Sequence, residues 1–396
     1  MGDFARLRLT FRPNLRLAVG AAGLLTFINL YPTQAFLPIL AKDFDTTLAH
    51  TGLTITAILV AVAIVAPFVG GISDAFGRRR LILAAAYLLV LPTTLIAFAP
   101  SLTVLIFLRF LQGLLLPFIF AVTVAYIAEE CPGPDAVRAT GSYAIGTIIG
   151  GFGGRFVAGW VADLLNWRAA FLVLAALTLA IAAFTAVCLP PERNFRPTSG
   201  WRGSLAGFGD HLHNRQVLAT CAVGFAVLFS IVAAFTYATV LLASPPYSLG
   251  PAQLGSVFVV YLLGAVSTPL AGRLTLRLGR RRTVWLAAAV GIAGLLLTLL
   301  PSLWAIIGGM ALIAVGIFTE QVLSIGYVAL AARGARSSAV GLYVSCYYVG
   351  GSLGGVLPAG IWSHAGWPGC VALVLLVQCA MLTITWLAWP SDPALR

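Results

Sequence analysis

Charged side chains are scarce in this sequence. Asp, Glu, Lys and Arg together make up 9% of the 396 residues, whereas hydrophobic residues make up 60% and the mean hydropathy is +0.99. A soluble domain carries about a quarter charged residues, so this chain has too few to cover a surface in contact with water. The scarcity excludes a soluble domain and indicates a protein that lies within a lipid bilayer.

Cysteine and histidine are also few, with six and four residues. The cysteines lie mostly within apolar runs and lack metal-ligand spacing, so we expect free, buried thiols, no disulfide and no metal site. The sequence contains no Walker-type phosphate loop, which excludes ATP-driven pumping within this chain. Residues 350–354 fit the G-x-S-x-G pattern of hydrolases, but that pattern requires a strand-to-helix turn and here lies inside an apolar run. We therefore expect neither a cofactor nor an enzymatic activity.

Long apolar runs fill almost the whole chain. A run of about 20 apolar residues is enough to cross a bilayer as a helix, because lipid offers no partner for backbone polar groups. Twelve such runs occur, at residues 17–40, 51–73, 81–98, 102–128, 139–164, 169–189, 216–243, 252–275, 283–300, 303–331, 338–362 and 368–389. The sequence predicts an all-α membrane protein with twelve transmembrane helices.

The net charge of +12 is distributed unevenly. In the twelve-span arrangement, twenty of the 24 basic residues fall on one side, and the other side holds only Lys42 and Arg168. This asymmetry is typical of the positive-inside rule and predicts that both termini are cytoplasmic. The first run is too long for a cleavable signal peptide and lacks a small-residue cleavage site after it. We expect a multi-pass protein of a bacterial-type inner membrane that binds no nucleic acid.

The chain repeats itself. Residues 67–80, "PFVGGISDAFGRRR", return in altered form at residues 269–282, "PLAGRLTLRLGRRR". The polar stretch 190–215 separates six runs in residues 1–189 from six in residues 216–396, so we predict two six-helix bundles joined by a cytoplasmic linker. Parallel repeats of this kind place a binding site between the halves near the membrane midplane. This architecture favours transport of a small molecule.

Three motifs resemble those of the major facilitator superfamily, and the resemblance covers nearly the whole chain. The first lies between the second and third spans and contains Gly70, Asp74, Gly77, Arg78 and Arg79. The second is "RFLQG", Arg109 to Gly113, in the fourth span. The third has the spacing of the antiporter motif in the fifth span, with Arg155 where that motif has Pro; its positions are Gly141, Gly150, Gly154, Arg155 and Gly159. The resemblance is closest to the twelve-span drug:proton antiporters.

The first motif implies a conformational latch. In the family, its acid meets the N-terminus of the eleventh helix, here near Ser337 and Ser338, when the transporter faces outward. A carboxylate at a helix N-terminus is stabilised by the helix dipole and by free N–H groups. The repeat has Leu276 in place of Asp74, so only one copy of the turn can make this contact. A plain turn that sets topology is the alternative.

Glu320 is the only acid deep within a span, and its counterpart in the repeat is Phe118. A charge at that depth is unfavourable by at least about 2.5 kcal/mol, and burial favours the protonated form of a carboxyl group. We therefore expect Glu320 to carry the coupled proton, with a structural hydrogen bond as the alternative. Arg109 and Arg155 are the two deep bases; the resemblance assigns proton coupling to Arg109, whereas Arg155 has a structural and a functional interpretation open.

Neutral polar and aromatic side chains complete a candidate substrate cavity. Such groups on cavity-lining helices suit broad recognition of amphipathic compounds. The set, together with Glu320, is Asn29, Tyr31, Gln34, Gln112, Tyr237, Tyr261, Tyr347 and Tyr348. Two arginines against one acid favour neutral, zwitterionic or anionic substrates over large cations.

We therefore expect proton-coupled efflux of small amphipathic compounds by alternating access, driven by the proton gradient and carried out by a monomer. A uniporter or a proton-coupled importer or exporter of a small metabolite, such as a sugar or an organic anion, is the alternative. A third and less favoured alternative is a sensor that uses the same transport-like scaffold.

Overall fold

The computed structural model describes residues 14–131, 134–193, 211–332 and 336–390. The described elements up to residue 193 are α1 (Leu15–Leu30), η1 (Pro32–Ala35), α2 (Leu37–Asp43), α3 (Leu48–Phe76), α4 (Arg78–Ile96), α5 (Leu102–Glu130), α6 (Pro134–Leu164) and α7 (Trp167–Cys188). The later elements are α9 (Arg215–Ala243), α10 (Pro251–Val257), η2 (Phe258–Leu262), α11 (Leu263–Leu278), α12 (Arg280–Leu297), α13 (Leu303–Ala331) and α14 (Arg336–Ala388). All of them are helices, as predicted.

Polar caps mark where several of these helices begin. The side-chain oxygens of Thr47, Ser101, Asn166 and Asn214 accept hydrogen bonds from backbone N–H groups in the first turns of α3, α5, α7 and α9. A cap of this kind satisfies a backbone donor that has no partner within the helix. The apolar runs thus end at short polar connections, so the positions of these helices could be predicted from the sequence.

Nine helices in the described part of the chain are long and apolar enough to cross a membrane. Three further crossings complete the predicted twelve: α1 with its continuation through α2, the 18-residue α12, and the second part of α14. The two crossings within α14 meet at Gly366, whose φ of 58° is not helical. Positive φ is readily adopted by glycine, so this residue allows the chain to reverse between two adjacent spans.

Two predicted spans are not continuous helices. The first stops at Leu30, passes through the 3-10 turn η1, which begins at Pro32, and resumes as α2. The eighth changes to the 3-10 segment η2 between α10 and α11. Proline has no N–H to continue the helical ladder, which explains the first break. Both breaks place irregular backbone in the interior of the molecule, and the candidate site lies there.

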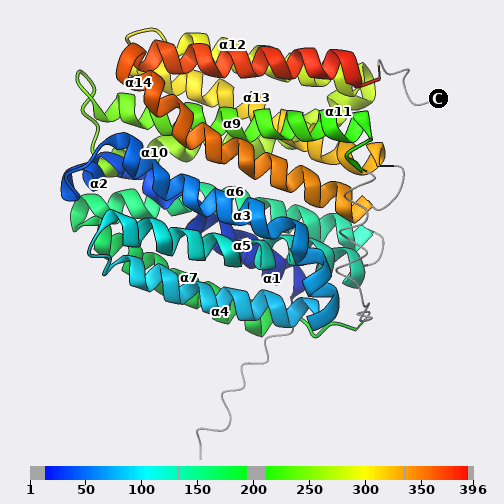
Figure 1. The fold of residues 1–396 in the computed structure, drawn as a ribbon. Helices are drawn as coiled ribbons and strands as arrows, with labels where there is room; N and C mark the ends of the chain where they lie inside the picture. The colour runs from blue at the N-terminus through cyan, green and yellow to red at the C-terminus, as the bar shows by residue number, and fades with distance from the viewer. Residues whose placement is uncertain (1–13, 132–133, 194–210, 333–335, 391–396) are drawn as a thin grey trace, which may run out of the picture.

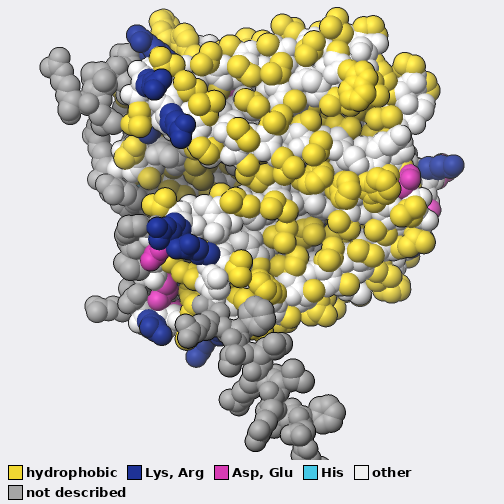
Figure 2. Space-filling view, turned by 180° about the vertical axis from the view of Figure 1, so that it is seen from behind, with side chains coloured by type: hydrophobic (Ala, Val, Ile, Leu, Met, Phe, Trp, Pro, Cys, Tyr) yellow, Lys and Arg dark blue, Asp and Glu magenta, His cyan; other side chains and the backbone are white. Residues whose placement is uncertain are grey.

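The elements form two bundles that lie side by side (Figure 1). Elements α1 to α7 make one half and α9 to α14 the other, with α3 and α14 packed against each other across the boundary. The predicted linker 190–215 falls largely outside the described residues. Hydrophobic side chains cover most of the surface that faces the viewer in Figure 2, as a chain in lipid requires.

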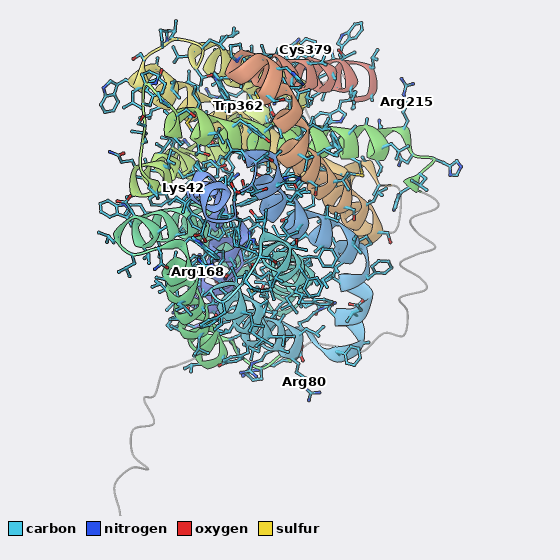
Figure 3. The ribbon with its side chains drawn as sticks, turned by 60° about the vertical axis from the view of Figure 1, so that its left-hand side comes forward. Lys42, Arg80, Arg168, Arg215, Trp362 and Cys379 are labelled. Atoms are coloured by element: carbon cyan, nitrogen blue, oxygen red, sulfur yellow. The ribbon has the colours of Figure 1, made fainter. Side chains whose placement is uncertain are left out.

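The two ends of the bundles differ in charge. One end carries the repeated Arg triplets at the starts of α4 and α12, and we call it the basic end. Dark blue side chains gather there in Figure 2. The opposite end carries Lys42 and Arg168, whose labels are near each other on the left of Figure 3. Arg215 is labelled on the right of the same view. We call the end with Lys42 and Arg168 the Lys42 end.

The halves are joined toward the Lys42 end. Among the described residues, the three hydrogen bonds between the halves are Gln34 Nε2 to Thr236 Oγ1 at 2.7 Å, Thr56 Oγ1 to the Ser352 carbonyl at 3.2 Å, and Trp160 Nε1 to Ser256 Oγ at 3.1 Å. Toward the basic end, side chains added at Gly70 and Gly272 would meet no atom within 4 Å. The structure therefore represents a state in which the Lys42 end is closed.

Candidate functional site

The repeated turns have the same backbone and different partners. Gly77 and Gly279 both adopt positive φ, 91° and 81°, directly before the Arg triplets. In the first turn, Arg78 forms ion pairs with Asp74 and with Glu129, the latter at 2.6 Å. The N–H of Arg78 also donates to Glu192 at 2.8 Å. These contacts tie the start of α4 to the ends of α3, α5 and α7.

The second turn has no acid in the corresponding place. Leu276 is 74% exposed, Arg280 lies over the ring of Tyr327, and Arg281 lies over the ring of Trp285. The asymmetry in the sequence thus becomes an ionic network at one turn and cation–π contacts at the other. The latch contact of Asp74 with the start of α14 stays a prediction, because Asp74 pairs with Arg78 here and the side chain of Ser337 lies outside the described part.

Arg109 is completely buried in the first half. Its guanidinium donates to the carbonyl oxygens of Asn29 at 2.7 Å, Leu30 at 2.5 Å and Thr54 at 3.1 Å. Asn29 and Leu30 are the last residues of α1, and their carbonyls lose their helical partners where the helix breaks. Arg109 therefore caps the end of α1 and supplies donors that the broken backbone needs.

A group of neutral polar side chains extends from Arg109 within the same half. Gln112 accepts from Arg109 at 2.7 Å and donates to Thr93 at 2.7 Å. The Asn29 amide donates to Thr178 at 2.9 Å, and its oxygen accepts from Thr93 at 3.3 Å. Two residues predicted to line the substrate cavity, Asn29 and Gln112, thus belong to a polar core that holds α1, α4, α5 and α7 together.

Arg155 lies where the halves meet. It is 2% exposed, and its guanidinium carbon lies 4.6 Å from the centroid of the Tyr31 ring, 4.4 Å from that of Phe258 and 4.9 Å from that of Tyr261. We call these three rings the aromatic cage. Tyr31 belongs to the first half, whereas Phe258 and Tyr261 lie on η2 in the second. The cage thus combines the two irregular segments of the fold around one cation.

Gln34 joins this cation to the second half. Its side-chain oxygen accepts from Nε of Arg155 at 2.6 Å, while its amide donates to Thr236 on α9. Nη1 of Arg155 also donates to the carbonyl oxygen of Gly151, one turn earlier on α6. Tyr31, Gln34, Arg155 and Tyr261, which the sequence predicted as site residues, are therefore brought together.

Aromatic side chains of α14 continue this interface. The ring of Tyr348 stacks on Phe120 of α5 with centroids 5.9 Å apart, and Tyr347 packs edge-on against Tyr348 at 5.4 Å. Tyr237 lies apart from this group: its hydroxyl donates to the carbonyl oxygen of Gly355 at 3.0 Å, and its ring faces Trp362.

Glu320 is completely buried in the second half. Its Oε2 accepts from the amide of Gln378 at 3.3 Å, and its Oε1 has no partner among the described residues. The amide oxygen of Gln378 also lacks one. A protonated carboxyl group can donate to a neighbouring acceptor, whereas a carboxylate can only accept, so two unpaired oxygens at this contact fit the acid form of Glu320.

The glycines of the antiporter-like motif let helices approach closely. A Cβ at Gly150 would lie 2.6 Å from the carbonyl oxygen of Leu24, and one at Gly154 would overlap that of Ile28, both on α1. Gly159 faces Pro251 across the halves, and Gly141 meets no atom within 4 Å. Close approach of this kind between apolar helices requires small residues. The motif therefore sets the distance from α6 to α1 and to α10.

Several partners in these networks were missed from the sequence: Thr93, Thr178, Glu192, Thr236, Phe258 and Gln378. The last of them carried a signal, because Gln378 is the one amide in the apolar run 368–389. Phe258 carried none, since one phenylalanine among many apolar residues predicts no contact with a cation.

A helical membrane protein with two repeated bundles, joined at one end and holding polar groups between them, is a membrane transporter by architecture. The family model described as Major Facilitator Superfamily matches residues 19–250 and 228–396. The chain belongs to the major facilitator superfamily, as its motifs predicted.

Comparisons with individual proteins agree with this assignment. The inner membrane transport protein YnfM of Escherichia coli is 34% identical over 93% of this chain and 88% of its own length. The multi-drug resistance efflux pump PmrA of Streptococcus pneumoniae is 28% identical over 48% of each chain. The crystal structure of a point mutant of the nucleoside transporter NupG superposes with a TM-score of 0.73 over 95% of this chain and all of its own, at 14% identity. That last likeness concerns the fold alone.

Proposed function

We propose that this transporter exports small amphipathic compounds in exchange for protons, by alternating access between its two halves. The basic end then faces the cytoplasm, with both termini on that side of a bacterial-type inner membrane, and the Lys42 end faces the opposite side. Each chain holds both halves and acts as a monomer. The direction of transport rests on the antiporter-like motif of α6 and on the partial similarity to PmrA, a multi-drug resistance efflux pump.

The environment of Glu320 carries the coupling proposal. It is the only acid among the fully buried polar side chains of the described part, and one of its oxygens lacks a partner there. Proton exchange by a buried carboxyl group requires that the neutral form be stable when the site is closed to water. Glu320 meets that requirement, and Gln378 on α14 is the group that would sense the change in its protonation.

Asp74 and Arg109 have supporting roles in this proposal. Asp74 can leave Arg78 and dock on the start of α14 when the basic end closes, which stabilises the opposite state. Arg109 has its donors directed at backbone oxygens of α1 and α3, so it transmits movement between these helices. Gly70 lies beside Asp74 on α3 and leaves room for the closing half.

The test measures proton release from inside-out vesicles that are acid inside. The fluorescence of an amine dye, which the pH gradient quenches, reports the loss of that gradient. We expect a panel of amphipathic compounds to include at least one that discharges the gradient with the natural chain and not with Glu320→Gln. Asp135→Asn is the matched control, because it also converts an acid to an amide but at an exposed residue. It should discharge the gradient like the natural chain.

The other outcomes separate the alternatives. Equal discharge by Glu320→Gln would remove Glu320 from coupling and make Asp74 the next acid to test. Compound flux with no movement of protons would support a uniporter in place of an antiporter.

A further inference from the structure

Arg155 is a buried cation without an acidic partner. Among the described residues, no carboxylate lies within ion-pair distance of its guanidinium, although the side chain is 2% exposed. Arginine keeps its charge at any relevant pH, so it cannot relieve this burial by losing a proton. An unpaired charge in a membrane interior is unfavourable and commonly marks a substrate pathway.

The way Arg155 is held leaves one edge of the guanidinium available. Of its five N–H donors, one on Nε binds Gln34 and one on Nη1 binds the carbonyl of Gly151. No hydrogen bond is made by Nη2 within the described part of the chain. The aromatic cage packs around the guanidinium carbon at 4.4–4.9 Å. A carboxylate can bind a guanidinium with two parallel hydrogen bonds on the Nη1–Nη2 edge or on the edge that includes Nε. Because Nε is occupied by Gln34, the Nη1–Nη2 edge is the one that remains available.

Arg109 provides the contrast that makes this edge informative. Its Nε, Nη1 and Nη2 all bind oxygens of the first half, three of which are backbone carbonyls that cannot move away independently of their helices. An incoming anion would have to displace those bonds. At Arg155 it would fill unused donors, so Arg155 is the arginine that an anion can bind without breaking existing hydrogen bonds.

The surroundings of this edge favour a particular kind of anion. The aromatic cage presents ring surface from both halves, Tyr31 from the first and Phe258 and Tyr261 from the second. A single positive charge neutralises a monoanion, whereas a dianion would leave a second buried charge without a partner. Aromatic rings favour an apolar or aromatic body.

We propose that Arg155 binds the carboxylate of the transported compound, and that the substrates are small monocarboxylates with an apolar or aromatic body. This inference rests on the proposed transport function and narrows its substrate class. Because Tyr31 and η2 hold the same guanidinium from opposite halves, a carboxylate on its unused donors binds directly beside contacts that join the halves toward the Lys42 end. Substrate binding and the movement of the halves are thereby linked at one side chain.

The test is ligand-dependent thermal unfolding of the purified full-length chain in lipid nanodiscs, without any proton gradient. A ligand that binds the folded state raises its unfolding temperature in a concentration-dependent way. Three probes share one ring system: 2-naphthoate, 2-naphthamide and 2-naphthylmethylammonium. We expect 2-naphthoate to stabilise the natural chain at concentrations at least about tenfold lower than those that the amide requires. We expect the ammonium probe to have no effect.

Substitutions then assign the effect to one residue. Arg155→Gln should weaken 2-naphthoate binding by about 10- to 100-fold, as expected for loss of charge-assisted hydrogen bonds. Arg138→Gln, the same substitution at an exposed position of α6, should bind like the natural chain. Arg155→Lys keeps the charge but loses the paired donors, and it should bind 2-naphthoate more weakly than the natural chain while still preferring it to the amide.

The proposal is overturned if the natural chain shows no stabilisation by 2-naphthoate or equal stabilisation by the amide. It is also overturned if Arg155→Gln or Arg155→Lys retains the full affinity for 2-naphthoate. If Arg155→Gln does not fold, two other results decide: whether the natural chain prefers 2-naphthoate to the amide, and whether Arg155→Lys binds 2-naphthoate more weakly. The assay involves no transport, so a negative result here leaves gradient discharge by other compounds intact, and failure of discharge leaves this binding result intact.

Discussion

Arg109 and Arg155 are both arginines buried in neighbouring helices of the same half, and they are held in opposite ways. Arg109 is held by four oxygens of its own half, and three of these belong to the backbone. Arg155 is held by three aromatic rings, a side-chain amide and one backbone carbonyl of its own helix, with partners in both halves. A buried cation saturated by backbone stabilises a fold, whereas one held by exchangeable groups is available for a ligand and for conformational change.

The largest expected difference concerns stability. Arg109→Leu leaves the carbonyls of Asn29 and Leu30, at the broken end of α1, buried without donors, and each such group is unfavourable by about 1–3 kcal/mol. We expect a loss of about 3 kcal/mol or more, or failure to fold. Arg155→Leu removes an unpaired charge and leaves mainly Gln34 without its partner, so we expect about 1 kcal/mol or less.

Thermal unfolding of both variants in the same lipid nanodiscs measures this difference. Arg138→Leu serves as the control, since the side chain of Arg138 is exposed on the same helix as Arg155. Equal losses for Arg109→Leu and Arg155→Leu would contradict the distinction between a structural and a ligand-binding arginine.

The sequence was sufficient for the fold because lipid imposes a simple rule on it. The long apolar runs follow from the need to satisfy backbone hydrogen bonds within each helix in lipid. The excess of arginine on one side, including the turns after Gly77 and Gly279, follows from the preference of basic residues for the cytoplasmic side. The structure confirms the helices, and both glycines adopt positive φ at the equivalent turns of the two halves.

The candidate site was only partly predictable, for a physical reason. A polar residue in an apolar run signals that a partner exists, but its direction around the helix depends on how helices pack. Asn29 and Gln34 are five residues apart in the same predicted span, yet Asn29 faces the polar core and Gln34 faces the other half. The break between α1 and η1 separates their directions, and a continuous helix would have placed them differently.

A smaller effect is expected from the two amides that accompany the arginines. Gln112→Leu removes one acceptor of Arg109 within the first half and should lower stability by about 1 kcal/mol without shifting the halves. Gln34→Leu removes the link from Arg155 to Thr236 and should shift the equilibrium away from closure of the Lys42 end.

Nitroxide labels at Leu165→Cys and Trp304→Cys report this equilibrium. Both positions are exposed, one in each half, near the Lys42 end, and exposed Cys379 is replaced by Ser to prevent labelling there. We expect the distance between labels to lengthen or broaden in Gln34→Leu and to stay unchanged in Gln112→Leu. A longer distance in both variants would mean that the two amides act alike.

The smallest effect concerns a third arginine, at the surface of the Lys42 end. The carboxylate of Asp43 accepts from the indole of Trp167 at 2.9 Å and from Arg168 at 2.8 Å, and these two contacts lower the pKa of Asp43 below its usual range. A lowered pKa in the folded state stabilises the fold above the unfolded pKa of about 3.9. This stabilisation is lost as the pH falls through the lowered folded value.

Asp43→Asn should therefore melt slightly below the natural chain at pH 7. The difference should begin to shrink as the pH falls below about 4 and should be gone below the lowered pKa of the folded state. Arg168 and Asp43 are both about 40% exposed, so solvent screens their ion pair and keeps the effect small. The deficit of Arg109→Leu should stay constant over the same range, because neither the guanidinium nor its carbonyl partners titrate there. A deficit in Asp43→Asn that persists at low pH would show that α2 is held to α7 by shape alone and not by charge.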